Sequence, residues 1–164
     1  MVQDESIFQY EVTLKRVWAK KGSRPRRLVT GSKDRVCAYG ALAHDGTQVY
    51  RTYASCNSMF FLKYIKTLLK KYRRMILFID KAPWHLKTKA VQKFFHDHRR
   101  HIKVIEFPAG FPEANPVEET WREGKHDDRL GAYFHPTPID FKQAVSSYYR
   151  TKKFTLNVFN YLCQ

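Results

Sequence analysis

In the first third of the chain, β-branched and aromatic side chains gather in short runs separated by turn residues such as Gly22 and Gly31. Short runs of this composition between turn residues are typical of strands. The pattern predicts an antiparallel meander with a hairpin at His44-Asp45-Gly46. The predicted strand segments are residues 6–10, 16–19, 35–43 and 48–53.

From residue 57 onwards the apolar positions recur every three or four residues. Phe61, Ile65 and Leu68 share one side of a helix and lysines occupy the other, which predicts an amphipathic helix over residues 57–72. The apolar run at residues 75–79 predicts a buried strand that presents the carboxylate of Asp80 at its C-terminal tip. The same reasoning predicts helices over residues 86–98, 115–127 and 139–150 and a strand over residues 102–107.

The order of these elements predicts the fold class. A three-strand meander followed by helix, strand, helix, strand and helix is the order of an α/β, ribonuclease-H-like fold, in which a mixed β-sheet is flanked by α-helices. In that topology the first and fourth strands lie side by side. Asp4 and Asp80 should therefore be neighbours, although they are far apart in the sequence.

Length and composition predict one globular domain covering residues 1–164. A hydrophobic content of 43% excludes a disordered chain, and no run approaches the ~20 apolar residues that span a bilayer. The N-terminus lacks a basic-then-apolar signal pattern, so we expect a cytoplasmic protein. Cys37, Cys56 and Cys163 are odd in number and lack paired metal spacing, so we expect reduced structural thiols.

The charge of the chain indicates a polyanionic partner. Lysine and arginine total 30 against 15 for aspartate and glutamate, which gives a net charge of +15. Any single basic run fits a solvated face, but the excess is spread along the whole chain. A compact domain of this charge is typical of proteins that bind the phosphate backbone of nucleic acids, with an affinity that falls steeply with salt.

Three acids stand at positions where the predicted fold makes them converge. Asn115-Pro116 is typical of a helix N-cap followed by proline, which places Glu118 in the first turn and Trp121 one turn later on the same face. Convergent carboxylates from Asp4, Asp80 and Glu118 suit two divalent cations for phosphodiester chemistry. Taken alone, Glu118 also fits the glutamate of a capping box, and Asp4 fits a solvated terminal acid.

Other acids compete for the third position of such a site. Glu119 points about 100° away from Glu118 on a helix, so the two side chains cannot both face the site. Asp127 or Asp128 is an alternative third acid. Both rank below Glu118, because the Asn-Pro turn fixes Glu118 near the ends of the strands.

The histidines divide into two groups. His96, His98 and His101 are spaced so that they do not share one helical face, and a solvated basic helix end explains them better than a metal cluster. His85 follows Asp80 closely, so it fits either a group that contacts a phosphate or orients a carboxylate, or a structural histidine.

Three segments carry a resemblance to a known family. They are the apolar strand that ends in Asp80 with Ala82-Pro83-Trp84-His85 after it, the proline-rich turn that leads to Asn115-Pro116-Val117-Glu118 and Trp121, and the opening Asp4-Glu5-Ser6. Together they resemble the DDE-superfamily endonuclease domain of insertion-sequence transposases related to the mariner group. The resemblance covers nearly the whole chain.

The resemblance implies the catalytic domain of a DNA transposase, which cleaves phosphodiesters and transfers strands in cut-and-paste transposition. It implies Asp4, Asp80 and Glu118 as the catalytic and metal-binding triad, with two Mg²⁺ or Mn²⁺ ions as cofactors. It also implies double-stranded DNA as the partner, a homodimer as the active form, no membrane, and a prokaryotic, nucleoid-associated location in the cytoplasm. The candidate substrate contacts are Lys81, Trp84, His85 and Arg122.

Two departures from the family pattern keep alternatives open. Lys81 stands where the family commonly has Asn, and a cation there either weakens metal binding or contacts a DNA phosphate. The sequence has no helix-turn-helix region before Asp4, so we expect recognition of the element's ends from another polypeptide or a missing N-terminal region. The alternative function is a catalytically inactive or repurposed DNA-binding remnant. A ribonuclease-H-type enzyme acting on RNA–DNA hybrids shares the acids and the fold.

Overall fold

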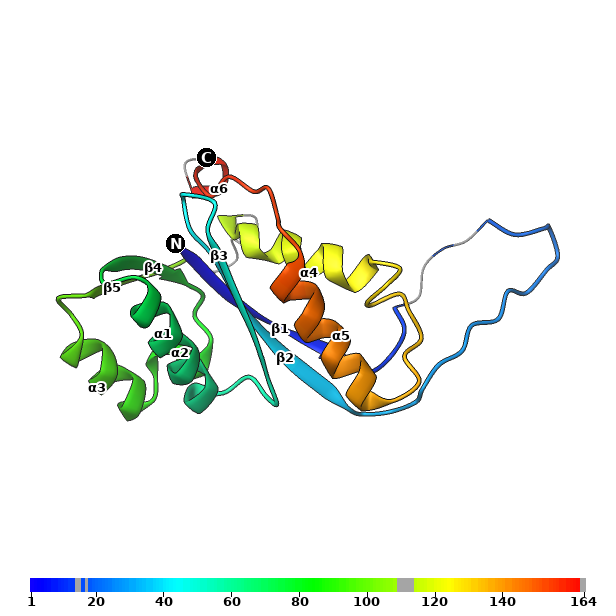
Figure 1. The fold of residues 1–164 in the computed structure, drawn as a ribbon, viewed down its shortest axis with the longest axis horizontal. Helices are drawn as coiled ribbons and strands as arrows, with labels where there is room; N and C mark the ends of the chain where they lie inside the picture. The colour runs from blue at the N-terminus through cyan, green and yellow to red at the C-terminus, as the bar shows by residue number, and fades with distance from the viewer. Residues whose placement is uncertain (14–15, 17, 109–113, 163–164) are drawn as a thin grey trace.

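A mixed five-stranded sheet forms the centre of the molecule, with strand order β3-β2-β1-β4-β5 (Figure 1). The computed structural model describes residues 1–13, 16, 18–108 and 114–162. Strands β1 and β2 are antiparallel, as are β2 and β3, whereas β1, β4 and β5 run parallel. The strands are β1 (Val2–Gln9), β2 (Arg35–Leu42), β3 (Gln48–Tyr53), β4 (Met75–Ile79) and β5 (Ile102–Glu106).

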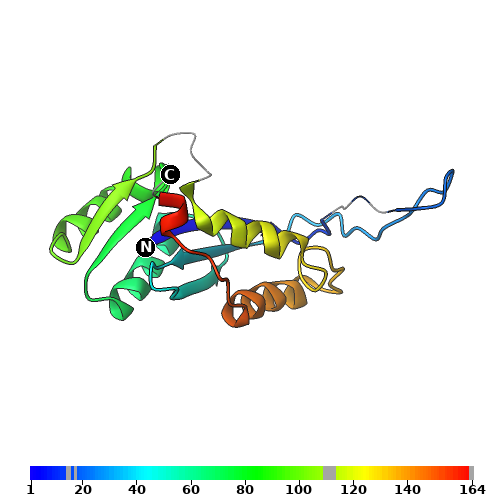
Figure 2. The ribbon, with the colours of Figure 1, turned by 90° about the horizontal axis from the view of Figure 1, so that it is seen from above.

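Helices cover both faces of this sheet (Figures 1 and 2). One core cluster joins α4 (Pro116–His126) and α5 (Pro138–Thr151) to one face through residues such as Trp121 and Tyr149. The opposite cluster joins the other face to α1 (Ser58–Lys71), α2 (Pro83–Leu86) and α3 (Lys89–Asp97). A short α6 (Phe159–Leu162) follows near the C-terminus. None of the helices in the described part of the chain is long and apolar enough to cross a membrane.

Side-chain caps determine where the long helices begin. The Oδ1 atom of Asn57 accepts the N–H of Phe60, which starts α1, and the Oδ1 atom of Asn115 accepts the N–H of Val117, which starts α4. The Thr137 hydroxyl caps α5 in the same way. Each cap satisfies one of the backbone donors that a helix start leaves unpaired. The predicted helices at 57–72, 115–127 and 139–150 are therefore confirmed to within two residues at each end.

The register of the sheet brings the first two predicted acids to the same level. Val2 on β1 is the parallel partner of Phe78 on β4. Two residues further along both segments, Asp4 therefore lies beside Asp80, which comes just past the C-terminal end of β4. This confirms the prediction that the first and fourth strands are neighbours.

One predicted helix is shorter than expected, and one predicted strand is wrong. The helix expected over residues 86–98 forms as α3 but begins three residues late, because Thr88 takes extended backbone angles (φ −88°, ψ 136°), and the short α2 precedes it. The strand expected over residues 16–19 is not formed by Arg16, Trp18 or Ala19, while its remaining residue lies outside the described part. The described residues 18–28 of the connection from β1 to β2 instead extend away from the sheet (Figures 1 and 2), and Trp18 is fully exposed.

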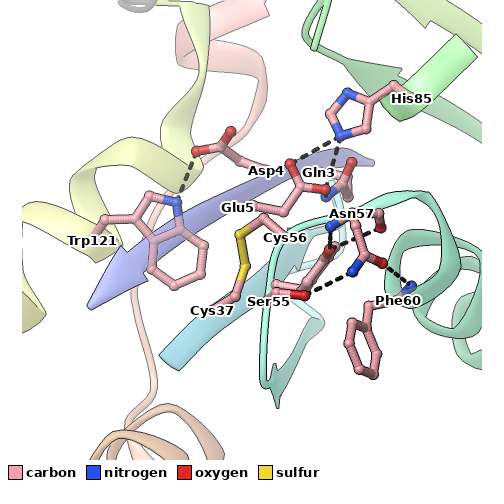
Figure 3. The surroundings of a disulfide bond; sticks show 11 residues. Gln3, Asp4, Glu5, Cys37, Ser55, Cys56, Asn57, Phe60, His85 and Trp121 are labelled. Atoms are coloured by element: carbon pink, nitrogen blue, oxygen red, sulfur yellow. Dashed lines mark hydrogen bonds and ion pairs between the residues drawn. A yellow bond between two sulfur atoms is a disulfide. The ribbon is translucent and has the colours of Figure 1, made fainter. Parts of the chain in front are cut away.

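The expectation of reduced cysteines is also wrong for two of the three. Cys37 on β2 and Cys56 just before α1 form a disulfide, with 5.6 Å between their Cα atoms (Figure 3). The β2–β3 hairpin brings them together, because it pairs Cys37 with Tyr53 and so returns the chain to Cys37. Sequence spacing alone does not reveal this proximity. Cys163 lies outside the described residues.

Candidate active site

Asp4 is a buried acid on the face of the sheet that α4 covers. Its side chain is on the third residue of β1 and only 4% of the residue is exposed. The indole Nε1–H of Trp121 donates a hydrogen bond to Asp4 Oδ2 at 2.8 Å (Figure 3). Trp121 follows Glu118 by three residues, so this bond fixes the start of α4 against β1. The hydrogen bond from Trp121 gives a physical reason for the predicted position of Glu118 near the ends of the strands.

Gly40 makes room for this arrangement. It is the β2 partner of Asp4 on one side and of Tyr50 on the other. A Cβ atom on Gly40 would lie 2.8 Å from Trp121 Cη2 and 2.5 Å from Tyr50 Cε1. Real Cβ atoms do not approach neighbours so closely, so only glycine lets the indole lie flat enough on the sheet to reach Asp4.

The surroundings of Asp4 disfavour its negative charge. Burial raises the pKa of Asp4 well above its usual value, and the negative charges of Glu118, Glu5 and Asp80 raise it further. The hydrogen bond from Trp121 lowers the pKa but does not offset these effects. Three carboxyl groups thus lie close enough to Asp4 to repel its negative charge, and a bound cation would relieve the repulsion.

Asp80 follows β4 directly and is held at one oxygen. Its Oδ1 atom accepts the N–H of Ala82 at 2.9 Å and lies 2.7 Å from His85 Nδ1. Half of the Asp80 side chain is exposed. Partial burial raises the pKa of Asp80, but the hydrogen bonds from His85 and Ala82 and the charge of His85 lower it more, so the net shift is downward.

His85 connects Asp80 to an acid on the opposite face of β1 from Asp4. Its Nε2 atom lies 2.8 and 2.9 Å from the two carboxylate oxygens of Glu5, and only 1% of its side chain is exposed (Figure 3). Burial alone would lower the pKa of His85, but hydrogen bonds and charges from Asp80 and Glu5 raise it to about 10. His85 is therefore an imidazolium at neutral pH and donates to both carboxylates.

Glu118 stands exposed in the first turn of α4. Asn115 Oδ1 accepts the N–H of Val117 at the N-cap, and the backbone N–H of Glu118 donates to the Asn115 carbonyl at 3.2 Å. Its neighbour Glu119 instead pairs with Arg122. Asp127 is the C-cap of α4, about 16 Å along the helix from its start at 1.5 Å per residue. The structure therefore brings Glu118, and not Asp127, into the electrostatic neighbourhood of Asp4.

The four candidate substrate contacts lie in different surroundings. Lys81 is exposed beside Asp80, whereas Trp84 is half-buried and packs against the α1 core cluster. His85 is buried between two acids, so it is shielded from substrate. Arg122 is exposed and lines a cavity of about 700 Å³ with residues 152–156.

The donor atoms of this site fit hard divalent cations. Asp4, Asp80 and Glu118 offer only carboxylate oxygens, which Mg²⁺ and Mn²⁺ prefer. Among the described residues, the group whose ligand atoms all lie within 4.8 Å of one another is Glu5, Asp80 and His85, and not the triad. His98, by contrast, bonds through Nδ1 to the carbonyl of Phe94 at the end of α3, away from these acids.

The family model described as DDE superfamily endonuclease matches residues 1–135. The chain belongs to this family. A search of curated proteins finds no match.

Solved structures of transposase and integrase chains share the fold of this domain. A structure titled "Mos1 transposase paired-end complex with left transposon end" is 16% identical, with a TM-score of 0.66 over 99% of this chain and 49% of that one. The structure titled "Crystal structure of the Mos1 mariner paired end complex with Mn" is 14% identical, with a TM-score of 0.66 over 99% of this chain and 50% of that one. The catalytic core domain of BIV integrase is 14% identical, with a TM-score of 0.51 over 98% of this chain and 93% of that one. These likenesses confirm the ribonuclease-H-like fold, and this chain spans about half of the Mos1 chains.

Sequence reasoning missed two residues that shape the site. Glu5 was given no role, although consecutive residues of a strand point to opposite faces, and an acid next to Asp4 therefore reaches a different set of neighbours. Gly40 was also missed, because its importance depends on the pairing of β2 with β1 and on the place of Trp121. The alternation of β1 was a usable signal for Glu5; no local signal existed for Gly40.

Proposed function

We propose that this DDE domain is the catalytic domain of a DNA transposase, which cleaves phosphodiesters and transfers DNA strands with divalent metal ions. The observation that supports the proposal is that Asp4 lies close enough to Glu118 and Asp80, on separate parts of the chain, for their charges to raise its pKa, in addition to the larger effect of burial. The pairing of β1 with β4 supports a position of Asp4 beside Asp80. The hydrogen bond from Trp121 to Asp4 holds the first turn of α4 nearby.

Each residue of the triad has a distinct part in this proposal. Asp80, half-exposed at the strand tip, and Glu118, exposed on α4, offer oxygens on the open side, whereas Asp4 forms the buried floor. When bound, two Mg²⁺ or Mn²⁺ ions would activate a water for in-line attack and stabilise the leaving 3′ oxygen. The same carboxylates would serve strand transfer by the resulting 3′-hydroxyl.

Double-stranded DNA is the proposed substrate. The net charge of +15 suits a phosphate backbone. The Mos1 neighbour is described as a complex with a transposon end, which agrees with a DNA substrate for this domain. The exposed Lys81, next to the half-exposed Asp80, is the proposed phosphate contact closest to the acids.

Nicking of a supercoiled plasmid with and without Mg²⁺ or Mn²⁺ tests the proposal. Wild-type protein should nick the plasmid only with the cation, and Asp80→Asn should abolish nicking while salt-sensitive DNA binding is retained. Asp97→Asn, which changes an exposed acid paired with Lys93 on α3, is the matched control and should nick normally.

Three other results would redirect the proposal. Equal nicking by Asp80→Asn would remove Asp80 from the site. DNA binding by the wild type with no cation-dependent cleavage would support the inactive DNA-binding remnant. Faster cleavage of an RNA–DNA hybrid than of a DNA duplex would favour a ribonuclease-H-type enzyme. The homodimer and a separate recognition segment stay predictions, and light scattering with and without duplex DNA tests the first.

A further inference from the structure

Glu5 is a buried acid that the proposed reaction does not use. It adjoins Asp4 in the sequence but lies on the opposite face of β1, and only 4% of its side chain is exposed. Burying a carboxylate is costly unless it is paired and hydrogen-bonded. His85 is the partner, since its Nε2 atom faces both Glu5 oxygens, and Gln3 Nε2 donates to Oε1 at 3.0 Å.

His85 is held on every side. Its Nε2 atom faces Glu5 and its Nδ1 atom lies 2.7 Å from Asp80 Oδ1. Its ring packs on Phe61 with 4.4 Å between ring centroids, and its backbone N–H bonds to the carbonyl of Ala82 at 3.0 Å. A ring with both nitrogens and one face engaged has a single orientation, so it can transmit the position of Glu5 to Asp80.

The effect on Asp80 is specific to one oxygen. Both bonds to the Asp80 carboxylate, the hydrogen bond from Ala82 N–H and the ion pair with His85 Nδ1, fall on Oδ1, and Nδ1 also lies 3.2 Å from the backbone carbonyl oxygen of Asp80. Rotation of the carboxylate would break both bonds. The arrangement therefore separates the two oxygens into one that the protein binds and one, Oδ2, that is available to a ligand.

We propose that Glu5 and His85 are a positioning pair, in which Glu5 orients the His85 ring and His85 fixes Asp80 Oδ1 so that Oδ2 is presented to a divalent cation. This inference rests on the proposed function, because it assigns Asp80 to the metal site. Partners that hydrogen-bond a metal-ligating group typically change metal affinity by about 10- to 100-fold when they are removed. Neither residue touches the substrate in this arrangement.

A cation bound among Glu5, Asp80 and His85 themselves is the competing arrangement, since their ligand atoms lie within 4.8 Å of one another. Metal ligation needs an unprotonated ring nitrogen. Here each ring nitrogen faces a carboxylate oxygen at 2.7–2.8 Å, which is the distance of a charge-assisted hydrogen bond.

Calorimetric titration with Mn²⁺ alone, without DNA, tests the positioning pair. Wild-type protein should bind Mn²⁺, and His85→Ala should weaken the affinity about tenfold or more. Glu5→Gln keeps an oxygen that accepts from Nε2 and should stay within about threefold of wild type. In an Asp80→Asn background, His85→Ala should cause no further loss, because the pair acts only through Asp80.

Two further variants guard against a general loss of structure. His85→Ala leaves Glu5 buried without its partner, so the double variant Glu5→Ala/His85→Phe removes the charge and keeps an aromatic ring against Phe61. It should lose as much Mn²⁺ affinity as His85→Ala. His135→Ala removes another buried histidine, whose Nε2 bonds to the carbonyl of Leu130, and should lower the melting temperature without changing Mn²⁺ affinity.

The possible outcomes separate the inference from the function on which it rests. Absence of Mn²⁺ binding by the wild type would overturn both. Binding that Asp80→Asn weakens but His85→Ala leaves unchanged would overturn the positioning pair alone. Electron spin-echo spectra of bound Mn²⁺ give a further check: the strong ¹⁴N coupling of a directly bound imidazole, lost in His85→Ala, would show His85 to be a ligand and would also overturn the pair.

Discussion

On the α4 face of β1, Asp4 is held by a neutral donor, the indole of Trp121, whereas on the α2 face Glu5 and Asp80 share the imidazolium of His85. The consequences for charge are opposite. Asp4 has a raised pKa, mainly from burial, while the bonds and charge of His85 bring the pKa of Asp80 below its usual value. The α2 face thus contains its own positive charge, and the α4 face depends on a cation from outside.

The two faces also differ in how they are fastened. The α2 face belongs to the core cluster that contains the Cys37–Cys56 disulfide, so a covalent bond ties β2 to the start of α1. The α4 face is held by packing of aromatic rings, with 5.0 Å between the centroids of Trp121 and Tyr149. The stability of the α2 face therefore depends on redox conditions, and the packing of the α4 face depends on the space left by Gly40.

The largest expected effect contrasts the two neighbouring acids of β1. Asp4→Asn should reduce cation-dependent plasmid nicking about 1000-fold, equivalent to about 4 kcal/mol, because it removes a proposed metal ligand. Glu5→Gln should reduce nicking less than about tenfold, since the amide oxygen still accepts from His85. Nicking rates of the two variants and the wild type, measured at saturating Mg²⁺, test this contrast. Equal losses would mean that the two faces are not functionally distinct.

Reduction of the disulfide should destabilise the α2 face. The bond joins residues 19 apart in the sequence, and a loop of this length corresponds to about 3 kcal/mol of unfolding free energy. Urea unfolding with and without dithiothreitol measures the difference. The matched variant Cys37→Ala/Cys56→Ala should be insensitive to the reductant. An unchanged wild-type midpoint would indicate that the two thiols are not joined in solution.

Gly40→Ala should damage the α4 face selectively. The added Cβ would push Trp121 away from Asp4, and overpacking of this kind costs about 2 kcal/mol. The melting temperature should fall and nicking should weaken with it, whereas the response to dithiothreitol should remain. A stable and fully active variant would show that the Trp121–Asp4 bond does not need this close approach.

The smallest expected effect is a gain in stability. Because the folded-state pKa of Asp4 is raised, its contribution is fully present below the unfolded value near 3.8 and is lost as pH rises through the folded pKa. Asp4→Asn removes that loss and still accepts from Trp121, so it should be about 1 kcal/mol more stable at neutral pH. Thermal melts across pH check this, and added Mg²⁺ should stabilise the wild type more than the variant.

Patterns within single elements predicted much of this structure. The apolar run before Asp80, the Asn115-Pro116 cap and the spacing in α1 each depend on neighbours in the sequence, and all three are confirmed. The Cys37–Cys56 disulfide, the role of Gly40 and the Glu5–His85 pair depend on which strands adjoin. Such contacts arise only when the sheet assembles, so local periodicity contains no record of them.

The alternation of side chains along β1 sets a constraint on how this domain can change over evolution. Asp4 and Glu5 serve different faces only because they are adjacent on one strand. Insertion or deletion of one residue within β1 would exchange the faces of every following side chain. We expect relatives to vary this strand by substitution while its length stays fixed, since the insertion or deletion of one residue would exchange the two alternating faces.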